Sequence, residues 1–507
     1  MGWGKVYSAS LVGLEAELVD VEADSSAGQA AFFIVGLADK SIDEAKERVR
    51  GAIKNSGFSF PRSRVIVNLA PAYLKKYGTS YDLAIAASIL QAAGQLRWED
   101  SDNALLLGEL SLEGKLRAVA GVLPIVLSAK KMGCTRIFLP RDNAEEASVL
   151  EGIDIFPVET LGDFVRFCRG KMDWTPAKFV PKKVEIVSPV NIGSIRGQLH
   201  ARRALLVAAS GFHNLLLWGP PGSGKTMLAK SLPSILPALS WEESLEVTKI
   251  YSVAGLLVGG AGLISGRPFR SPHHSSSGAS IVGGGRIPTP GEVSLAHRGV
   301  LFLDEFGEFP KYVLENLRQP LEDGKVQVSR VARSVVFPSR FLLVGAMNPC
   351  PCGYLGDSEK ECLCSGNSLD RYSQRISGPI LDRIDLHIHV PRVKFHDLYE
   401  APVTDAWDSS TVRAQVETVH RIQAERFSGS GIFYNSEMSS DGVARFCSLD
   451  SETHSFFRDA VEKFSVSARS SNRMLKVART IADLDGSENI KLPHLVEALQ
   501  YRTRMGE

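Results

Sequence analysis

The sequence predicts an α/β protein: a parallel sheet with flanking helices that carries a glycine-rich loop, with an α+β domain before it and a helical domain after it. Three observations predict this. An apolar strand-like segment runs into the glycine-rich loop and then into a helix; strand-like and helix-like segments alternate before this loop; and the C-terminal part has helical periodicity with little strand signal. Because 507 residues allow about three domains, we expect an N-terminal domain at 1–172, a linker at 173–190, a central domain at 191–392 and a C-terminal domain at 405–507.

Composition excludes several classes of protein. The chain has 58 Lys and Arg against 57 Asp and Glu, so its net charge of +1 provides no general attraction for nucleic acid or an acidic membrane. No apolar run approaches the length of a membrane span, and the first residues lack the apolar core of a signal peptide. We therefore expect a cytoplasmic protein without a membrane partner, in which any binding of a polyanion depends on local patches of charge.

The N-terminal domain is predicted to be α+β because short apolar strands alternate with helical segments. Strands are expected at 31–35, 64–69, 104–110 and 136–139, and helices at 82–96 and 122–132. The linker prediction rests on a stretch with Pro176, Pro181 and no steady hydrophobic period. In the C-terminal domain, helices are expected at 413–427, 451–464, 468–484 and 493–503.

The glycine-rich loop matches G-x-x-x-x-G-K-[ST], the pattern of a phosphate-binding loop. It consists of Gly219, Pro220, Pro221, Gly222, Ser223, Gly224, Lys225 and Thr226. Glycines let the backbone wrap a phosphate with its N–H groups pointing inward, and the start of the following helix adds its positive dipole end. Lys225 would contact the β- and γ-phosphates, and the Thr226 hydroxyl would hold Mg²⁺. We therefore expect binding of ATP with Mg²⁺, against the alternative of a chance glycine turn before a helix.

A second apolar segment, 299–303, ends in the two carboxylates of Asp304 and Glu305. On a buried parallel strand these side chains would lie at the carboxyl edge of the sheet, beside the phosphate-binding loop. Asp304 would bind Mg²⁺, and Glu305 would accept the proton of the attacking water. The alternative is a strand that ends in solvated acids at a surface loop.

A third apolar segment, 341–347, ends in Asn348. Its amide would orient the attacking water near the γ-phosphate. A turn-forming Asn before Pro349 is the alternative, and the presence of the other two strands favours the functional interpretation.

These residues resemble the AAA+ ATPases, and several further blocks resemble the magnesium-chelatase-like YifB/ComM family. The blocks are Ile195–Gln198, His213–Leu217, Phe269–His274, Met347–Gly353 and Ile376–Asp385, and the resemblance covers essentially the whole chain. It implies a P-loop AAA+ module with a C-terminal helical lid and an N-terminal α+β domain similar to the Lon protease domain and to S5-like folds. ComM members are hexameric DNA helicases that drive branch migration during natural transformation. The resemblance therefore implies a homo-oligomer, a hexamer in these members, that acts on single-stranded or branched DNA.

The resemblance also assigns two arginines. Arg383 matches the arginine finger, which a neighbouring subunit inserts to stabilise charge in the phosphoryl-transfer transition state. The alternative for Arg383 is a salt bridge with Asp382 or Asp385. Arg469 matches the second sensor arginine at the start of a lid helix; the residues that follow it depart from the family pattern. Arg473 and Arg479 are rivals for that role on the same helix.

Four of the seven cysteines are clustered: Cys350, Cys352, Cys362 and Cys364. Thiolates bind soft or borderline cations tetrahedrally, so two close pairs can supply four ligands, and we favour a structural Zn²⁺. An iron–sulfur cluster and unligated thiols remain alternatives, whereas two disulfides are disfavoured in a reducing compartment.

Residues 321–337 predict a β-hairpin, and its tip region carries Arg330 and Arg333, with Lys325 earlier in the first strand. In chelatase-like AAA+ proteins a hairpin at this place points into the central channel of the ring. Cations there would follow a phosphate backbone, which makes these three residues candidate DNA contacts. A solvated hairpin is the alternative. The paired His273 and His274 are interpreted as polar residues of a glycine-containing loop.

The Lon-like resemblance raises the question of peptidase activity. Ser80 lies near the place of the nucleophile, but apolar residues occupy the helix positions where a partner lysine belongs, and Lys130 and Lys131 come about two turns later. We therefore expect Ser80 to cap a helix and the domain to have no peptidase activity.

The leading hypothesis is a ring-forming ATPase that moves along DNA. The alternative is a chaperone-like ATPase of the chelatase or MoxR type that remodels a protein partner. The chain lacks the D-x-S-x-S metal-adhesion motif of chelatase partner subunits, so such a partner would be a separate protein. Chelatase activity towards a porphyrin is a weaker third hypothesis.

Overall fold

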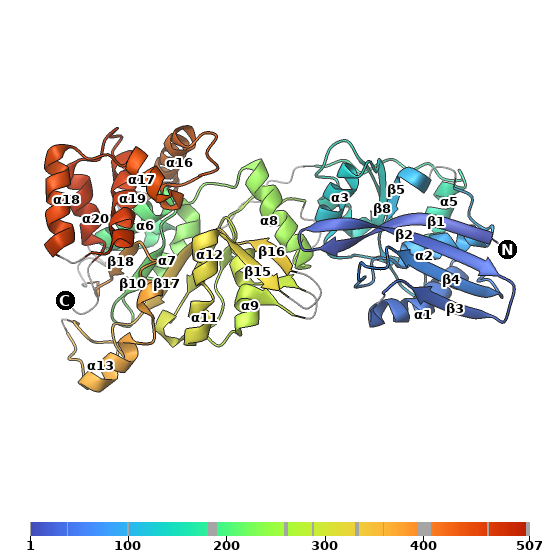
Figure 1. Ribbon diagram of the computed structural model, residues 1–507, viewed down its shortest axis with the longest axis horizontal. Helices are drawn as coiled ribbons and strands as arrows, with labels where there is room; N and C mark the ends of the chain where they lie inside the picture. Colours follow the sequence, from blue (N-terminus) through green and yellow to red (C-terminus); the bar gives the residue numbers. More distant parts are fainter. Residues whose placement is uncertain are drawn as a thin grey trace.

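A computed structural model describes residues 2–37, 39–98, 101–180, 190–257, 262–285, 288–329, 334–357, 359–393, 407–463 and 466–502. The molecule is elongated, with the N-terminal sheet at one end, a second sheet in the middle and the C-terminal helices at the other end (Figure 1). Among the described residues, none of the helices combines the length and the apolar character needed to cross a bilayer.

The N-terminal domain contains a seven-stranded mixed sheet with the order β3-β4-β2-β1-β5-β8-β9. Its strands are β1 (Gly2–Val12), β2 (Glu15–Ser26), β3 (Ala31–Val35), β4 (Arg64–Ala70), β5 (Ala104–Leu106), β8 (Arg136–Pro140) and β9 (Asp154–Val158). Its helices are α1 (Lys40–Asn55), α2 (Asp82–Ala92), α3 (Val122–Lys131), α4 (Ala144–Ala147) and α5 (Leu161–Cys168). A mixed sheet with helices confirms the expected α+β class.

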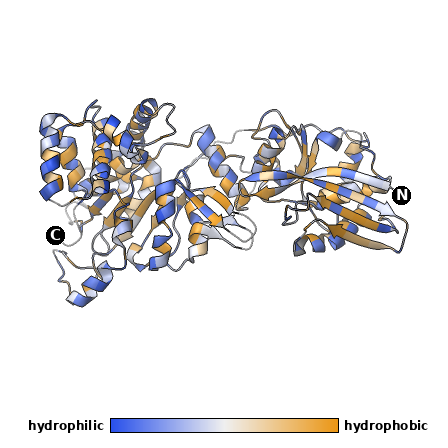
Figure 2. Cartoon of the chain, viewed as in Figure 1, coloured by the Kyte–Doolittle hydropathy of each residue, from blue (hydrophilic) through white to orange (hydrophobic). Residues whose placement is uncertain are grey.

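The longest strands of this domain, β1 and β2, were not predicted. They form one antiparallel hairpin with Gly2 opposite Ser25 and Val12 opposite Glu15. Both strands are mixed in hydropathy in Figure 2, since Ser, Asp and Glu separate small apolar residues along them. Only the sheet shows that Val6, Val19 and Val21 point inward and are fully buried.

Two local predictions in this domain were wrong. The expected strand 104–110 is interrupted, because Gly108 has a φ of 144° and separates β5 from the short β6 (Glu109–Leu110), which pairs with β7 (Leu116–Arg117). Ser80 does not cap a helix: Tyr81 occupies the N-cap position of α2 without a side-chain hydrogen bond. Asp82 at the helix start instead accepts hydrogen bonds from Arg48 Nε at 2.8 Å and from the Leu110 N–H, and burial raises its pKa to about 6.

The central sheet has five parallel strands in the order β11-β14-β17-β10-β18. These are β11 (Phe269–Arg270), β14 (Val300–Leu303), β17 (Leu342–Met347), β10 (Leu215–Trp218) and β18 (Leu386–His389), and they are flanked by α6 (Leu199–Gly211), α7 (Lys225–Ile235) and α8 (Trp241–Val253). Every residue of β14 and β17 is buried, as the continuous apolar runs predict for a sheet covered on both faces.

Shorter elements are inserted between these strands. They are α9 (Gly278–Val282), β12 (Gly283–Gly284), β13 (Thr289–Pro290), α10 (Glu292–Leu295), α11 (Lys311–Glu315), α12 (Arg318–Asp323), α13 (Gly366–Ser373) and α14 (Gly378–Leu381). The expected hairpin is formed by β15 (Lys325–Ser329) and β16 (Ser334–Pro338), which pair from Lys325 opposite Pro338 to Ser329 opposite Ser334.

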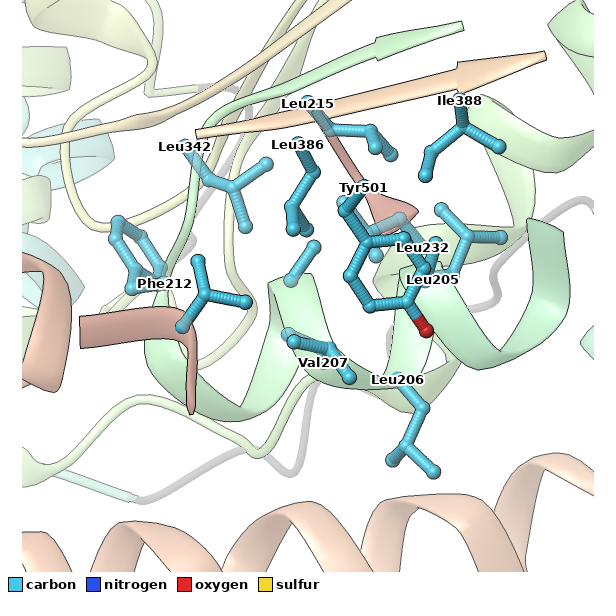
Figure 3. Packing of buried hydrophobic residues seen from close by; sticks show 14 of the residues in the cluster. Leu205, Leu206, Val207, Phe212, Leu215, Leu232, Leu342, Leu386, Ile388 and Tyr501 are labelled. Carbon is cyan, nitrogen blue, oxygen red and sulfur yellow. The ribbon is translucent and has the colours of Figure 1, made fainter. Parts of the chain in front are cut away.

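The C-terminal helices pack onto the central sheet as part of one core. They are α16 (Ser409–Arg426), α17 (Ser440–Phe446), α18 (Ser451–Lys463), α19 (Ala468–Leu484) and α20 (Leu492–Gln500). Four of them lie close to the predicted bounds, whereas α17 was not predicted. Tyr501 lies among the strand residues Leu215, Leu386 and Ile388 and the helix residue Leu205 (Figure 3). The lid and the sheet therefore share their buried apolar surface.

The N-terminal domain contacts the central module at two places. Helix α3 lies beside α8, where the Gly121 N–H donates to the Ser252 carbonyl at 2.9 Å and the Ser252 hydroxyl donates to Glu146. The turn of the β1–β2 hairpin lies against β16, since a Cβ at Gly13 would come within 2.6 Å of Val335 Cγ1. The domain boundaries stay a prediction. From the expected linker, Trp174 packs onto the N-terminal core, while 181–189 lie outside the described residues.

Candidate nucleotide-binding site

The predicted site residues meet at the carboxyl edge of the central sheet. The phosphate-binding loop follows β10, Asp304 and Glu305 follow β14, and Asn348 follows β17. Strands β14 and β10 are the two neighbours of β17, so parallel pairing carries all three strand ends to the same place.

The loop has the backbone that its glycines predict. Gly222 and Gly224 have φ angles of 76° and 92°, in the left-handed region, and Gly224 precedes Lys225, the first residue of α7. At Gly219 a Cβ would lie 2.1 Å from the Val390 carbonyl oxygen, so a side chain there would push the loop away from β18. Ser223 Oγ is buried and has no hydrogen-bond partner among the described residues. Glycine conformation and the start of α7 together make a cradle suited to phosphate.

Lys225 links the phosphate-binding loop to Asn348, the residue that follows β17. Its Nζ donates to the carbonyl oxygens of Gly219 and Pro220, each at 2.8 Å, and to Asn348 Oδ1 at 3.3 Å. Burial lowers the pKa of the ammonium to about 8, against a smaller opposing effect of the Asp304 carboxylate. A poorly hydrated cation beside the loop is well placed to attract an anionic ligand.

The expected magnesium ligands lie side by side. Thr226 Oγ1 donates to Asp304 Oδ2 at 3.0 Å, and the other carboxylate oxygen, Oδ1, accepts the Glu305 N–H at 3.0 Å. A hydroxyl and a carboxylate oxygen are hard ligands of the kind that Mg²⁺ takes beside phosphates.

Glu305 has a partner that sequence reasoning missed. His274 Nδ1 lies 2.9 Å from Glu305 Oε2, and in the Nδ1–H tautomer it donates to the carboxylate. Glu305 itself has a φ of 53°, and its side chain is 60% exposed. His274 is one of the two adjacent histidines that were interpreted as polar loop residues. The adjacent pair is visible in the sequence, but no known spacing connects it with Glu305.

We expect His274 to position Glu305 for catalysis. In His274→Ala the half-exposed carboxylate can turn towards solvent, so kcat for ATP hydrolysis should fall on the order of tenfold while KM stays unchanged. His274→Asn, whose amide can donate from a similar position, should recover part of the rate. The control is His273→Ala, which removes the bond to Ser275 and the ring that lies 4.1 Å from the His274 ring but leaves the contact between His274 and Glu305 in place. Equal losses in both alanine variants, or a loss that appears in KM, would contradict this role.

A cavity of about 400 Å³ opens beside the phosphate-binding loop. It is lined by Gln198, Leu199, His200, His389, Pro391, Arg392 and Val393. Gln198 Nε2 donates to the Ser223 carbonyl at 3.3 Å and to the Pro391 carbonyl at 2.6 Å, so one wall of the cavity touches the loop. The His389 ring lies 4.4 Å from the Trp218 ring. The volume and the flat side chains suit a nucleotide base, and we call this opening, which was not predicted, the base cavity.

The two arginines assigned by resemblance lie together, and their described contacts are with residues outside the phosphate-binding loop. The Arg383 side chain is 9% exposed; it donates to Glu322 and to the Pro379 carbonyl, and its Nε has no partner among the described residues. Arg469 is 75% exposed, with Nη1 3.9 Å from the same Glu322 carboxylate. The expected alternative for Arg383, a bridge to Asp382 or Asp385, is not among the contacts that it makes with the described residues.

The rival arginines have structural partners. Arg473 Nη1 donates to Asp385 Oδ1 at 3.0 Å, and Arg479 is buried against Asp483 and donates to the Ser487 carbonyl. Arg469 is therefore the exposed member of the three on α19.

The candidate DNA contacts are only partly described. Lys325 is exposed, and it opens β15 at the end of the hairpin away from the tip. Arg330 and Arg333 lie outside the described residues. On the described strands, Val326, Val328, Val335 and Phe337 are buried, so one face of the hairpin is anchored in the core.

The clustered cysteines come together as predicted. The Sγ atoms of Cys350, Cys352, Cys362 and Cys364 all lie within 4.8 Å of one another. Cys350 is buried and comes two residues after Asn348, so the cluster adjoins the phosphate-binding site.

Comparisons with known proteins agree with this geometry. The family model described as "Magnesium chelatase, subunit ChlI" matches residues 191–398, that described as "Subunit ChlI of Mg-chelatase" matches 21–143, and that described as "Magnesium chelatase, subunit ChlI C-terminal" matches 406–502. The competence protein ComM of Haemophilus influenzae is 42% identical, covering 98% of this chain and 97% of its own. YifB of Escherichia coli is 40% identical, over 98% and 96% of the two chains.

The chain belongs to the YifB/ComM family of magnesium-chelatase-like AAA+ proteins. An uncharacterized protein of Mycobacterium tuberculosis is 42% identical over 99% of both chains. As a member of this family, the chain is an AAA+ ATPase, and the parallel sheet with its helical C-terminal region is the expected AAA+ architecture.

The residues present fit the ATP and Mg²⁺ that this family implies. The positive-φ glycines leave the loop N–H groups free of Cβ clashes, Ser223 Oγ is buried without a partner among the described residues, and Thr226 and Asp304 bring two oxygen ligands together.

Proposed function

We propose that this protein is a ring-forming ATPase that couples ATP hydrolysis to movement along DNA and to branch migration, as in recombination and natural transformation. The proposed ATPase activity is supported by the five functional side chains that lie together at one edge of the sheet: Lys225, Thr226, Asp304, Glu305 and Asn348. The DNA part is supported by family membership, by the name "competence protein" of the Haemophilus influenzae relative, and by the anchored hairpin.

Each side chain has a distinct part in the proposed hydrolysis. The loop N–H groups and Lys225 hold the β- and γ-phosphates, while Thr226 and Asp304 hold Mg²⁺, which supplies positive charge beside the phosphates when bound. Asn348 orients the attacking water, and Glu305 accepts its proton at the carboxylate. Lys225 Nζ, shared with carbonyls of its own loop, would exchange those partners for phosphate oxygens.

The site is completed by a neighbouring copy of the chain in this proposal. Arg383 and Arg469 share Glu322, and their described contacts lie outside the phosphate-binding loop of their own chain. The exposed Arg469 beside the nearly buried Arg383 is suited to meet the γ-phosphate bound by the next subunit once Arg383 leaves Glu322. We propose a homo-oligomer, a hexamer by similarity to ComM, which light scattering with ATP would test. Zn²⁺ at the cysteine cluster is part of the same proposal, whereas the cytoplasmic location stays a prediction.

DNA should stimulate hydrolysis through the hairpin tip. We expect single-stranded or branched DNA to raise the ATPase rate several-fold, and Arg330→Ala/Arg333→Ala to abolish this stimulation while leaving the rate without DNA unchanged, because removing two phosphate contacts weakens DNA binding at every sequence. ATPase rates with and without DNA, at two salt concentrations, provide the measurement.

The matched control for charge is Arg445→Ala/Arg458→Ala, which removes two exposed arginines from lid helices far from the hairpin in sequence. This control should keep full stimulation. Indifference of the wild-type ATPase to every DNA would instead favour the alternative of a chelatase- or MoxR-like ATPase that remodels a protein partner.

A further inference from the structure

The cysteine cluster has the dimensions of a site for one metal ion. Cys350 Sγ lies 3.3 Å from Cys352 Sγ and 3.7 Å from Cys362 Sγ, and Cys352 Sγ lies 3.6 Å from Cys362 Sγ. Four thiolates around a tetrahedral Zn²⁺, with Zn–S bonds of about 2.3 Å, would be separated by about 3.8 Å. The Leu355 N–H donates to Cys350 Sγ at 3.4 Å, which fixes the position of this sulfur.

The same separations disfavour the other states of these cysteines. A disulfide requires sulfur atoms about 2.05 Å apart, and all seven cysteines are free. An iron–sulfur cluster spreads its thiolates over several irons, whereas these four lie within 4.8 Å of one another. A single ion with four sulfur ligands is the state that fits, and Zn²⁺ is the common ion with this preference.

The loop between the cysteine pairs touches the phosphate-binding loop. Gly353, directly after Cys352, has a φ of 86°, and a Cβ there would lie 2.7 Å from two ring carbons of Pro221. Gly353 is therefore in van der Waals contact with the second proline of the loop. A change in the position of Cys352 would be transmitted to the phosphate cradle over one residue.

The same loop also holds the wall of the base cavity. Asp357, whose side chain is 1% exposed, accepts a hydrogen bond from Arg392 Nε at 2.8 Å, and Arg392 lines the cavity. Arg392 Nη1 also lies 3.3 Å from Glu359 Oε2. Asp357 is itself held by the N–H groups of Glu359 and Lys360, so the carboxylate is fixed in place by the fold of the cysteine loop.

The chain after the fourth cysteine returns to the end of β17. Helix α13 starts two residues after Cys364, and near its end Tyr372 donates its hydroxyl to the Asn348 carbonyl at 3.0 Å. Through these contacts, the segment from Cys350 to Tyr372 touches the phosphate-binding loop, the base cavity and the water-orienting Asn348.

We infer that Cys350, Cys352, Cys362 and Cys364 bind one Zn²⁺ and that this zinc knuckle, residues 350–364, holds the ATP site in its binding-competent shape, so that affinity for ATP depends on zinc. The inference rests on the proposed ATP site. Without the ion, the two cysteine pairs are no longer joined to each other. Gly353 and Asp357 then lose the fold that holds them against Pro221 and Arg392. Loss of zinc, by chelation or by oxidation of the thiolates, therefore lowers nucleotide affinity.

The test measures metal content and nucleotide affinity on the full-length protein. Elemental analysis should find one zinc per chain in the wild type and in Cys134→Ser/Cys168→Ser, the matched control in the N-terminal domain, but at most a tenth of that in Cys362→Ser/Cys364→Ser. The Kd of a fluorescent ATP analogue, titrated in excess Mg²⁺, should rise at least tenfold when a chelator removes the zinc and should recover when Zn²⁺ is restored.

A second variant separates the knuckle contacts from the metal itself. Asp357→Asn leaves all four cysteines in place, so it should keep one zinc per chain and still weaken ATP binding about tenfold, since its hydrogen bond to Arg392 loses its charge. Circular dichroism would report whether the cysteine variant is folded. If it is unfolded, Asp357→Asn still tests the proposal.

The possible failures are distinguishable. A wild-type protein that contains zinc but binds no ATP would overturn the proposed ATP site. A wild type without zinc would overturn the metal site, and unchanged ATP affinity both after zinc removal and in Asp357→Asn would overturn only the dependence of the nucleotide site on zinc.

Discussion

Glu305→Gln should slow ATP hydrolysis by about 10²–10⁴-fold while ATP still binds, because the amide cannot accept the proton of the attacking water. The substitution is nearly isosteric and keeps the backbone at Glu305, where φ is 53°. The proposed phosphate contacts of Lys225 and the Thr226–Asp304 pair are untouched, so the Kd of an ATP analogue should stay within about twofold of the wild type. Single-turnover hydrolysis and an equilibrium titration on the same preparation provide both quantities.

The control for this prediction is Glu308→Gln. Glu308 lies three residues further along the same loop and pairs with Arg375 at the surface, so it matches the loss of charge without touching the proposed base. It should hydrolyse ATP at close to the wild-type rate. If Glu305→Gln hydrolysed ATP at the wild-type rate, Glu305 would not be the general base. If Glu305→Gln no longer bound ATP, the role of Glu305 would be structural.

Arg383→Ala should slow hydrolysis in the assembled protein by about 10³–10⁵-fold, as expected for loss of a guanidinium that stabilises the transition state. In the proposed oligomer, the missing group belongs to the neighbouring subunit. Inactive Arg383→Ala chains mixed with inactive Glu305→Gln chains should therefore regain activity, because some interfaces then combine an intact Glu305 from one chain with an intact Arg383 from the next. ATPase rate as a function of the mixing ratio is the measurement.

The pairing of Arg383 with Glu322 requires its own control. Glu322→Gln removes the same ion pair but leaves the guanidinium in place. It should retain most of the activity, since Arg383 has to leave Glu322 to reach a neighbouring site. If Glu322→Gln were as slow as Arg383→Ala, or if mixing restored no activity, the ion pair within the chain would be the important interaction and the intersubunit role would be wrong.

Much of the ATP site could be predicted because its parts are local in sequence. Glycines determine the conformation of the loop from Gly219 to Thr226. The buried strands are predicted by apolar runs, and Asp304 and Asn348 follow the ends of two of these runs. Parallel pairing then brings these strand ends together without further information. By contrast, the β1–β2 hairpin escaped prediction because its alternation of small apolar and acidic residues is weak until the sheet buries one side.

The sequence by itself determined the phosphate-binding loop, the polar strand ends, the lid helices and the presence of four thiols close together in the chain, because each depends on backbone preferences or spacings over a few residues. Only the tertiary structure decided that His274 holds Glu305, that Glu322 holds Arg383 and that Asp357 of the cysteine loop holds Arg392 at the base cavity. These pairs are 31, 61 and 35 residues apart. Their contacts are set by the packing of separate strands and loops, which no local pattern of residues records.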